Sequence, residues 1–327
     1  MIRRRDFITL MAGATAAWPL AARAQQSARI LHVGFLYPGP LVGAAPRIAP
    51  LTSGLQAGGL RVPDQVMVIP GVTDGNAALL APMATDLVAR KVDAILAVSP
   101  AAVRAARAAT TTIPIVAIDL ESDPTDSGFI ASYARPGGNI TGVFLDFPEF
   151  SKKWLEALKE AVPKISSVAV FWDSSTGPIQ IRAIEAAAQI LNIKLVILKM
   201  PGRADVESAF KSVTGQGASA LLILSSPFVS ANTKLLADQA LSHRLPAITL
   251  FPHFARDGGL IGYGPNFLSY FRHAGVMVAR ILRGADPAQT PIERPTRFEF
   301  VLNLKTAAVL GIAIPPATLL RADEVIE

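Results

Sequence analysis

The 327-residue chain contains no cysteine, which excludes disulfide bonds and thiolate chemistry. A bacterial lipoprotein carries its lipid on an N-terminal cysteine, so we also expect no stable membrane anchor. Charged residues are sparse at 17%, and aromatic residues make up 7%. Apolar residues make up 51%, and a chain of this length and composition can bury large cores in two domains.

Motifs that carry catalysis or hold a cofactor are also missing. The four histidines, His32, His243, His253 and His273, share no metal-ligand spacing. There is no P-loop and no G-x-S-x-G elbow, and Gly262-Tyr263-Gly264 lacks the third glycine of a dinucleotide site. We therefore expect no metal, no cofactor and no catalytic residue. An exported α/β hydrolase or transferase is kept as a less favoured alternative.

The first 24 residues are typical of an export signal peptide. Arg3-Arg4-Arg5 form a basic start, 8–20 is apolar, and Ala22-Arg23-Ala24 fits the rule for signal-peptide cleavage. The motif Arg4-Arg5-Asp6-Phe7-Ile8 resembles a twin-arginine signal, with ordinary Sec export as the alternative. The sequence thus predicts export to the periplasm.

Net charge gives no indication of nucleic-acid binding. The whole chain has 31 basic and 25 acidic residues. Removing the four arginines and one aspartate of the signal leaves 27 basic and 24 acidic residues. The exported protein is then only slightly basic, so we expect no nucleic-acid partner.

Strands and helices alternate along the chain in the pattern of parallel βαβ units. Predicted strands form one series in each half: 30–36, 65–69, 92–98 and 114–118, then 168–172, 193–198, 220–224 and 247–250. The segment 119–142 between them is rich in Asp, Gly, Pro and Ser and is interpreted as the passage between two domains. The sequence predicts an α/β protein with two doubly wound, Rossmann-like lobes.

The two halves share a feature at matching places. Ser99-Pro100 follows the third strand of the first series, and Ser226-Pro227 follows the third strand of the second. Each serine is predicted to be a helix N-cap, and each proline the first helical residue. We interpret this as one topology used twice, with a ligand cleft between the carboxyl ends of the two sets of strands.

Three stretches resemble the bacterial ABC transporter substrate-binding protein family, whose better-known relatives are TrpX-like binding proteins for aromatic amino acids. They are the leader RRRDFITL…AWPLAARAQQ, the turn 135–142 with its Arg-Pro-Gly-Gly-Asn, and the tail around 298–307 and 321–327. The resemblance implies the type I periplasmic binding protein fold. Lobe 1 would then comprise 25–142 plus about 264–327, and lobe 2 would comprise 143–263.

The family also implies how the protein works. The lobes would capture a small-molecule ligand by hinge closure, and the closed form would dock on an ABC permease driven by a cytoplasmic ATPase. A periplasmic protein that feeds a membrane sensor has the same fold, and the sequence does not separate the two roles. A LacI-like repressor is rejected, because an export signal stands where its DNA-binding helices would be.

Ser99 is the first candidate ligand contact. With the amides of Ala101 and Ala102 free beside it, this helix N-terminus could hold a ligand carboxylate, or the serine could cap only its own helix. Asp123 matches an Asp-Pro that the family places after the fourth strand. It could pair with a ligand amine or hydroxyl, or serve only as a turn former.

Most other candidates stand at or after predicted strand ends, where their side chains would face the cleft. They are Tyr37, Trp172, Asp173, Ser226, Phe228 and Phe251, and Tyr263 is added because it lies near the return crossover. Aromatic residues at several strand ends favour a ligand with an aromatic or apolar portion, although the same residues could fill the core. Tyr37-Pro38-Gly39-Pro40 departs from the Ser/Thr/Gly-rich loop of the family and offers fewer amide donors.

Overall fold

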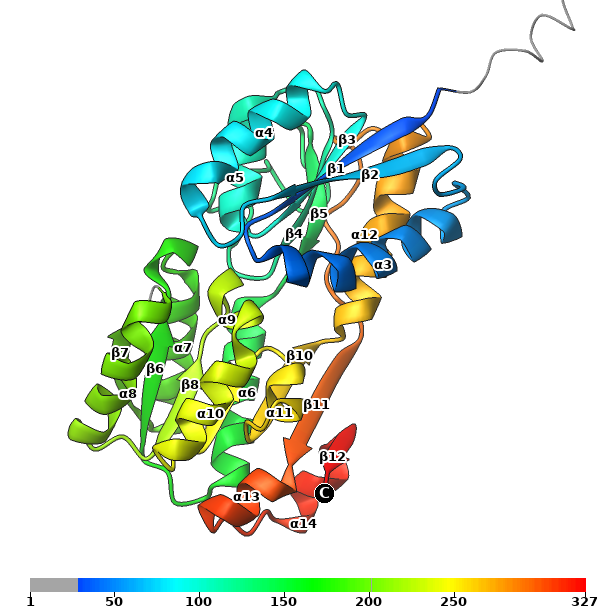
Figure 1. Cartoon of the computed structure of the whole chain (residues 1–327). Coiled ribbons are helices and arrows are strands. Elements are labelled where there is room, and N and C mark those ends of the chain that lie inside the picture. The colour runs from blue at the N-terminus through cyan, green and yellow to red at the C-terminus, as the bar shows by residue number, and fades with distance from the viewer. Residues whose placement is uncertain (1–28, 201) are drawn as a thin grey trace, which may run out of the picture.

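The computed structural model describes residues 29–200 and 202–327. The predicted signal peptide at 1–24, with its twin-arginine motif, lies outside the described residues. The rest of the chain forms two lobes, each built on its own sheet and covered by helices on both faces (Figure 1). This is the α/β architecture that the alternating pattern predicted.

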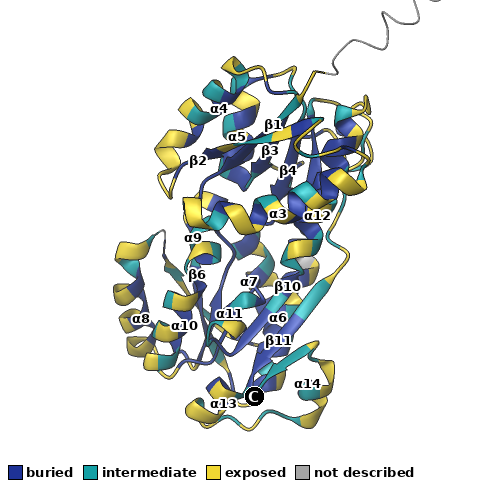
Figure 2. Cartoon of the chain, turned by 45° about the vertical axis from the view of Figure 1, so that its right-hand side comes forward, coloured by how far each residue is buried: buried dark blue, intermediate teal, exposed yellow. Residues whose placement is uncertain are grey.

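Lobe 1 contains a five-stranded sheet in the order β2-β1-β3-β4-β5, and every neighbouring pair is parallel. Its strands are β1 (Leu31–Tyr37), β2 (Val66–Val72), β3 (Ala94–Val98), β4 (Ile115–Asp119) and β5 (Ile140–Phe144). Helices α3 (Leu41–Ala57) and α12 (Phe267–Leu282) cover one face, and α4 (Leu80–Ala89) and α5 (Pro100–Ala109) cover the other. Figure 2 shows the strands as the buried middle layer.

Lobe 2 contains a seven-stranded sheet in the order β12-β11-β10-β9-β8-β6-β7, in which only β10 and β11 run antiparallel to each other. Its strands are β6 (Ser167–Trp172), β7 (Lys194–Lys199), β8 (Ala220–Ile223), β9 (Ala247–Thr249), β10 (Ile261–Pro265), β11 (Phe298–Asn303) and β12 (Glu324–Ile326). Its helices are α6 (Phe147–Ala161), α7 (Ile179–Leu191), α8 (Val206–Gly215), α9 (Pro227–Ala231), α10 (Thr233–Ser242), α11 (His253–Arg256), α13 (Leu304–Leu310) and α14 (Pro316–Arg321). No helix in the described part of the chain is long and apolar enough to cross a bilayer.

The prediction that one topology is used twice is confirmed by the strand orders. Numbered from its own first strand, each lobe begins with the order 2-1-3-4-5, as β2-β1-β3-β4-β5 and as β7-β6-β8-β9-β10. In such sheets the strand order reverses between the first and third strands, and a crevice opens there outside the carboxyl ends of these strands. Ser99-Pro100 follows β3 and Ser226-Pro227 follows β8, so both Ser-Pro turns lie at these switch points.

The predicted lobe limits need correction at both crossings. Strand β5 pairs with β4 in the first sheet, so the chain leaves lobe 1 after Phe144 rather than within 119–142. Of the segment 264–327 assigned to lobe 1, α12 does pack there. The strand β11 instead pairs with β10, and β12 pairs with β11, so 298–326 belongs to lobe 2. The chain therefore crosses between the lobes three times.

Helices α3 and α12 pack closely because glycines face each other at their contact. A Cβ atom on Gly54 would lie 2.0 Å from the carbonyl oxygen of Arg272, and one on Gly275 would lie 2.2 Å from that of Leu51. Only glycine fits at both positions. This contact matters for the ligand site, since both helices carry side chains into the cleft.

Candidate ligand-binding site

The two switch points face each other across the cleft between the lobes. Two adjoining cavities lie there, and Pro38 of lobe 1 and Pro227 of lobe 2 line both of them. We call the narrow space nearer α12 the inner cavity. We call the wider space between the loops that follow β1, β2, β6 and β8 the outer cavity.

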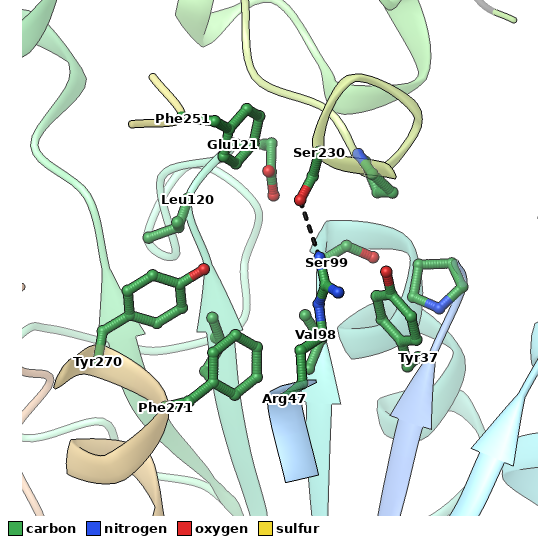
Figure 3. A pocket seen from close by; sticks show the side chains of 13 residues that line it. Tyr37, Arg47, Val98, Ser99, Leu120, Glu121, Ser230, Phe251, Tyr270 and Phe271 are labelled. Atoms are coloured by element: carbon green, nitrogen blue, oxygen red, sulfur yellow. Dashed lines mark hydrogen bonds between the residues drawn. The ribbon is translucent and has the colours of Figure 1, made fainter. Parts of the chain in front are cut away.

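The inner cavity combines an apolar lining with a few polar groups (Figure 3). Its walls include Tyr37, Arg47, Ser99, Leu120, Glu121, Ser230, Phe251, Tyr270 and Phe271. These residues come from both lobes, and in Figure 3 the side chains of Arg47, Glu121 and Ser230 point into the same space. A concave, largely apolar site with convergent polar groups is typical of small-molecule binding.

Arg47 is a buried cation without a carboxylate partner. Its side chain comes from α3, and the residue is 7% exposed. Its Nη2 donates to the Ser230 hydroxyl at 2.9 Å and its Nη1 to the Gly43 carbonyl at 2.6 Å. The guanidinium lies 4.5 Å from the centre of the Tyr37 ring. No carboxylate of the described residues lies within 4.0 Å of it. An unpaired buried charge is costly, so this arginine is poised for an anion.

Two buried acidic residues, Asp119 and Glu121, lie at the carboxyl end of β4. Asp119 ends β4 and is fully buried, and burial raises the pKa of its carboxyl to about 6. Glu121 is 6% exposed and lines the inner cavity. Burial, and next the nearby Asp119 charge, raise the pKa of Glu121 to about 8. In the described part of the chain Glu121 has no basic partner; its Oε1 accepts a 2.7 Å hydrogen bond from the Ser225 hydroxyl of lobe 2.

Ser99 stands at the cavity wall in a strained backbone conformation. Its φ is 95° and its ψ is 157°, a region that side chains other than glycine rarely adopt. Its hydroxyl accepts a long bond of 3.4 Å from the Ala102 amide and thereby caps α5. Strained residues concentrate at functional sites, and this one holds a hydroxyl beside the cavity.

The Tyr37 hydroxyl is a buried polar group that lacks a hydrogen-bond partner in the described structure. Its residue is 2% exposed and ends β1 at the inner cavity. Burying a hydroxyl without a partner costs free energy, so a partner from a ligand is the simplest compensation.

A family model for the ABC transporter substrate binding protein matches residues 47–326, which is most of the chain. The chain belongs to this family. The resemblance found in the sequence motifs is thereby confirmed.

Individual relatives of this substrate-binding protein are distant in sequence. A tyrosine-binding protein of Clostridioides difficile (strain R20291) is 25% identical over 232 residues, which are 70% of this chain and 66% of that protein. The chain therefore spans just under two thirds of the curated relative's length.

Solved structures confirm the fold. An ABC domain from Streptococcus pneumoniae in complex with L-Trp is 22% identical with a TM-score of 0.83, and the match covers 91% of this chain and all of that one. A conserved domain protein from Vibrio cholerae is 23% identical with a TM-score of 0.84 and the same coverages. The predicted two-lobed architecture of a periplasmic binding protein is therefore correct.

Six of the residues predicted from the sequence lie at the cleft of this substrate-binding protein. Three line the inner cavity: Tyr37, Ser99 and Phe251. Three line the outer cavity: Ala101, Asp173 and Phe228. All six follow or end strands, as predicted.

The other predicted residues are used elsewhere. Ser226 is fully buried and caps α9 by accepting from the Val229 amide. The Ala102 amide is not free, because it donates to Ser99. Trp172 packs against the lobe 2 core and donates to the Gly177 carbonyl.

Two predicted residues lie away from both cavities. Asp123 binds the Tyr133 hydroxyl at 2.8 Å and the Thr125 amide, in a separate hollow beside the crossover at 145–147. The Tyr263 ring packs on Phe150 and Phe300 within lobe 2. These two side chains satisfy local partners, so their place at a strand end or turn was not enough to bring them to the cleft.

Sequence reasoning missed Arg47, Glu121, Ser230 and Tyr270. One signal was present, because Arg47 is the single charged residue in the 17-residue helix α3. Glu121 and Ser230 carry no such signal, since acidic residues and serines are common in loops and short helices. Tyr270 reaches the cavity because the chain returns to lobe 1 at α12, which local periodicity does not reveal.

Proposed function

We propose that this protein is the periplasmic solute-binding component of an ABC importer and that its ligand is an α-amino acid with an aromatic or large apolar side chain. The lobes close on the ligand, and the closed form docks on the permease, whose cytoplasmic ATPase drives import. The ligand is bound and released unchanged. Export of the protein would follow from the signal peptide at 1–24, by the twin-arginine route.

One observation carries the ligand assignment: a buried arginine and a buried carboxyl group, neither paired with an opposite charge, face one cavity. Arg47 suits a carboxylate, and Glu121 suits an ammonium group. An α-amino acid supplies a carboxylate for Arg47 and an ammonium group whose charge would favour the ionised form of Glu121. A simple acid or a sugar would lack the ammonium group that suits Glu121.

The remaining polar groups support the carboxylate end. The Tyr37 hydroxyl lies on the same wall as Arg47, and Ser99 stands at the N-terminus of the ten-residue helix α5. A hydroxyl donor and a helix N-terminus both favour an anion.

The apolar walls support a large side chain. Leu120, Phe251, Tyr270 and Phe271 line the inner cavity and offer aromatic and aliphatic surface from both lobes. Two of the similar proteins named above, the tyrosine-binding protein and the ABC domain in complex with L-Trp, fit this class of ligand.

Calorimetry with purified protein tests the assignment. We expect L-tyrosine, L-tryptophan or L-phenylalanine to bind, while tyramine, which lacks the carboxylate, and 3-(4-hydroxyphenyl)propionate, which lacks the amine, bind at least tenfold more weakly. Arg47→Ala should weaken binding roughly 30-fold or more. Arg90→Ala, at an exposed surface ion pair, is the matched control and should bind normally. Equal binding of the truncated analogues would contradict the assignment.

Uptake of labelled ligand tests the importer role separately. Cells that lack this protein should lose high-affinity uptake of the ligand found by calorimetry. Unchanged uptake together with a lost transcriptional response would indicate the sensing role instead.

A further inference from the structure

The inner and outer cavities adjoin, because Pro38 and Pro227 line both. A ligand whose charged end lies at Arg47 and Glu121 would reach the outer cavity past these two prolines. The outer cavity is the larger one. The far end of an aromatic side chain would therefore meet the residues that line it.

Asp173 is a buried acceptor on this outer wall. It follows β6 at the switch point of lobe 2 and is 7% exposed. Its Oδ1 accepts a 2.9 Å bond from the Ser175 amide and caps the short turn that follows. The described residues place no basic nitrogen within 4.0 Å of its carboxylate and give Oδ2 no hydrogen bond.

The lining of the outer cavity combines apolar and polar residues. Leu80 and Ala101 come from lobe 1, and Phe228, Arg203 and Asn232 come from lobe 2. Asp173 Oδ2 keeps acceptor capacity on this wall, where a donor from a ligand could reach it. Asp74, the other carboxylate on this cavity, is exposed and can be solvated by water.

We propose that Asp173 is a specificity-determining residue that accepts a hydrogen bond from an O–H or N–H group at the far end of the ligand side chain. This inference rests on the proposed function and narrows its ligand class to aromatic amino acids that carry such a donor, with a phenol or an indole as the fitting chemistry. A phenylalanine-like side chain would leave the Asp173 oxygen without a partner and would be discriminated against.

The test compares binding constants for L-tyrosine, L-phenylalanine and 4-fluoro-L-phenylalanine, the last filling the space without offering a proton. The wild-type protein should prefer L-tyrosine by about tenfold or more over both analogues. Asp173→Asn retains an oxygen for the Ser175 cap but replaces the second acceptor with a donor. This variant should lose the preference to within about threefold while binding L-phenylalanine as before, because only the polar contact is removed.

Two controls keep the outcomes distinct. Asp86→Asn changes an exposed carboxylate on α4 that lines neither cavity and should leave the preference intact. An unchanged unfolding temperature for Asp173→Asn would show that the cap is kept. A wild-type protein that binds all three equally, or an Asp173→Asn variant that keeps the preference, would overturn this inference alone. If none of the amino acids binds, the proposed function falls as well.

Discussion

At the residue scale, the two matched Ser-Pro turns differ in backbone conformation. Ser99 has a φ of 95°, whereas Ser226 has a φ of −157°, which is ordinary extended backbone. Both side chains cap the helices that follow. The strain is therefore confined to the turn whose hydroxyl borders the inner cavity.

Substitutions at Ser99 separate the effect of its backbone strain from the effect of its helix cap. At position 99, glycine relieves the backbone strain, so Ser99→Gly should be more stable than Ser99→Ala by about 1–3 kcal/mol in urea denaturation. At position 226 the backbone is relaxed, so the same pair of variants, Ser226→Gly and Ser226→Ala, should differ much less. Equal stabilities for the position 99 pair would contradict strain at Ser99.

The acidic pair makes stability depend on pH. The folded protein holds the carboxyl of Glu121 protonated up to about pH 8, whereas the unfolded chain releases that proton near 4.5. Asp119 behaves likewise between 3.8 and about 6. The folded state thus binds more protons within these windows, and the free energy of unfolding should fall as pH rises through them. Urea denaturation of the ligand-free protein at pH 5 to 8 measures this slope.

Variants test which residue causes the fall of stability with pH. Within the pair Asp119 acts on Glu121, and the charged groups outside the pair that act on it are Asp173 and Arg104. Glu121→Gln should flatten the decline above pH 6, since it removes the group with the higher pKa. Glu207→Gln, on the surface of α8, should retain the wild-type slope. A wild-type protein equally stable at pH 5 and pH 8 would argue against a protonated Glu121.

At the element scale, the contact between α3 and α12 positions the site. Arg47 projects from α3 and Tyr270 from α12, and Gly54 and Gly275 set how close the two helices lie. The tail after α12 then leaves for lobe 2 as β11. A change in helix spacing would therefore move two proposed ligand contacts, Arg47 and Tyr270, without a substitution at either residue.

Alanine at the contact between α3 and α12 should reduce both the stability of the protein and its affinity for the ligand. Gly275→Ala should lower stability by about 2 kcal/mol or more, because the methyl group meets the backbone of α3, and should also weaken ligand binding. Gly215→Ala provides the matched control, since α8 leaves open space around Gly215 and alanine favours helix there. Thermal unfolding and calorimetry of both variants decide the outcome. An unaffected Gly275→Ala variant would show that the helices can separate freely.

At the scale of the whole molecule, the lobes meet through several polar contacts across the cleft. Besides the Arg47–Ser230 and Ser225–Glu121 hydrogen bonds, Arg104 Nη2 donates to the Ser175 carbonyl at 3.3 Å, and Arg182 lies 3.5 Å from Asp126. Three crossovers connect the lobes, so such contacts can form and break by a hinge motion. In this structure the two lobes are in contact through these bonds.

Solution scattering tests this hinge motion. Saturating ligand should reduce the radius of gyration, because it joins walls from both lobes. An Arg104→Ala, Arg182→Ala double variant should bind only a few-fold more weakly, since exposed contacts each contribute about 0–1 kcal/mol. A radius of gyration that stays constant on ligand addition would contradict closure.

The local pattern of the sequence predicted the first four strands of each lobe, the longer helices and the repeated topology. Apolar periodicity and Ser-Pro turns reflect neighbours along the chain, so Ser99, Asp173 and Phe228 were correctly placed after strands. Because strand ends at a switch point must border the crevice, residues such as Tyr37, Ser99 and Asp173 could be placed at the cleft from the order of strands alone.

Only the tertiary structure decided which charges meet and where the tail goes. Arg47 and Glu121 are 74 residues apart in a single lobe and converge through packing of α3 against the sheet and α12. Asp123 follows a strand too, yet it turns to Tyr133. Strand β11 pairs with β10 in the second sheet through hydrogen bonds between residues far apart in the sequence. Such contacts depend on burial and on neighbours distant in sequence, which no local pattern encodes.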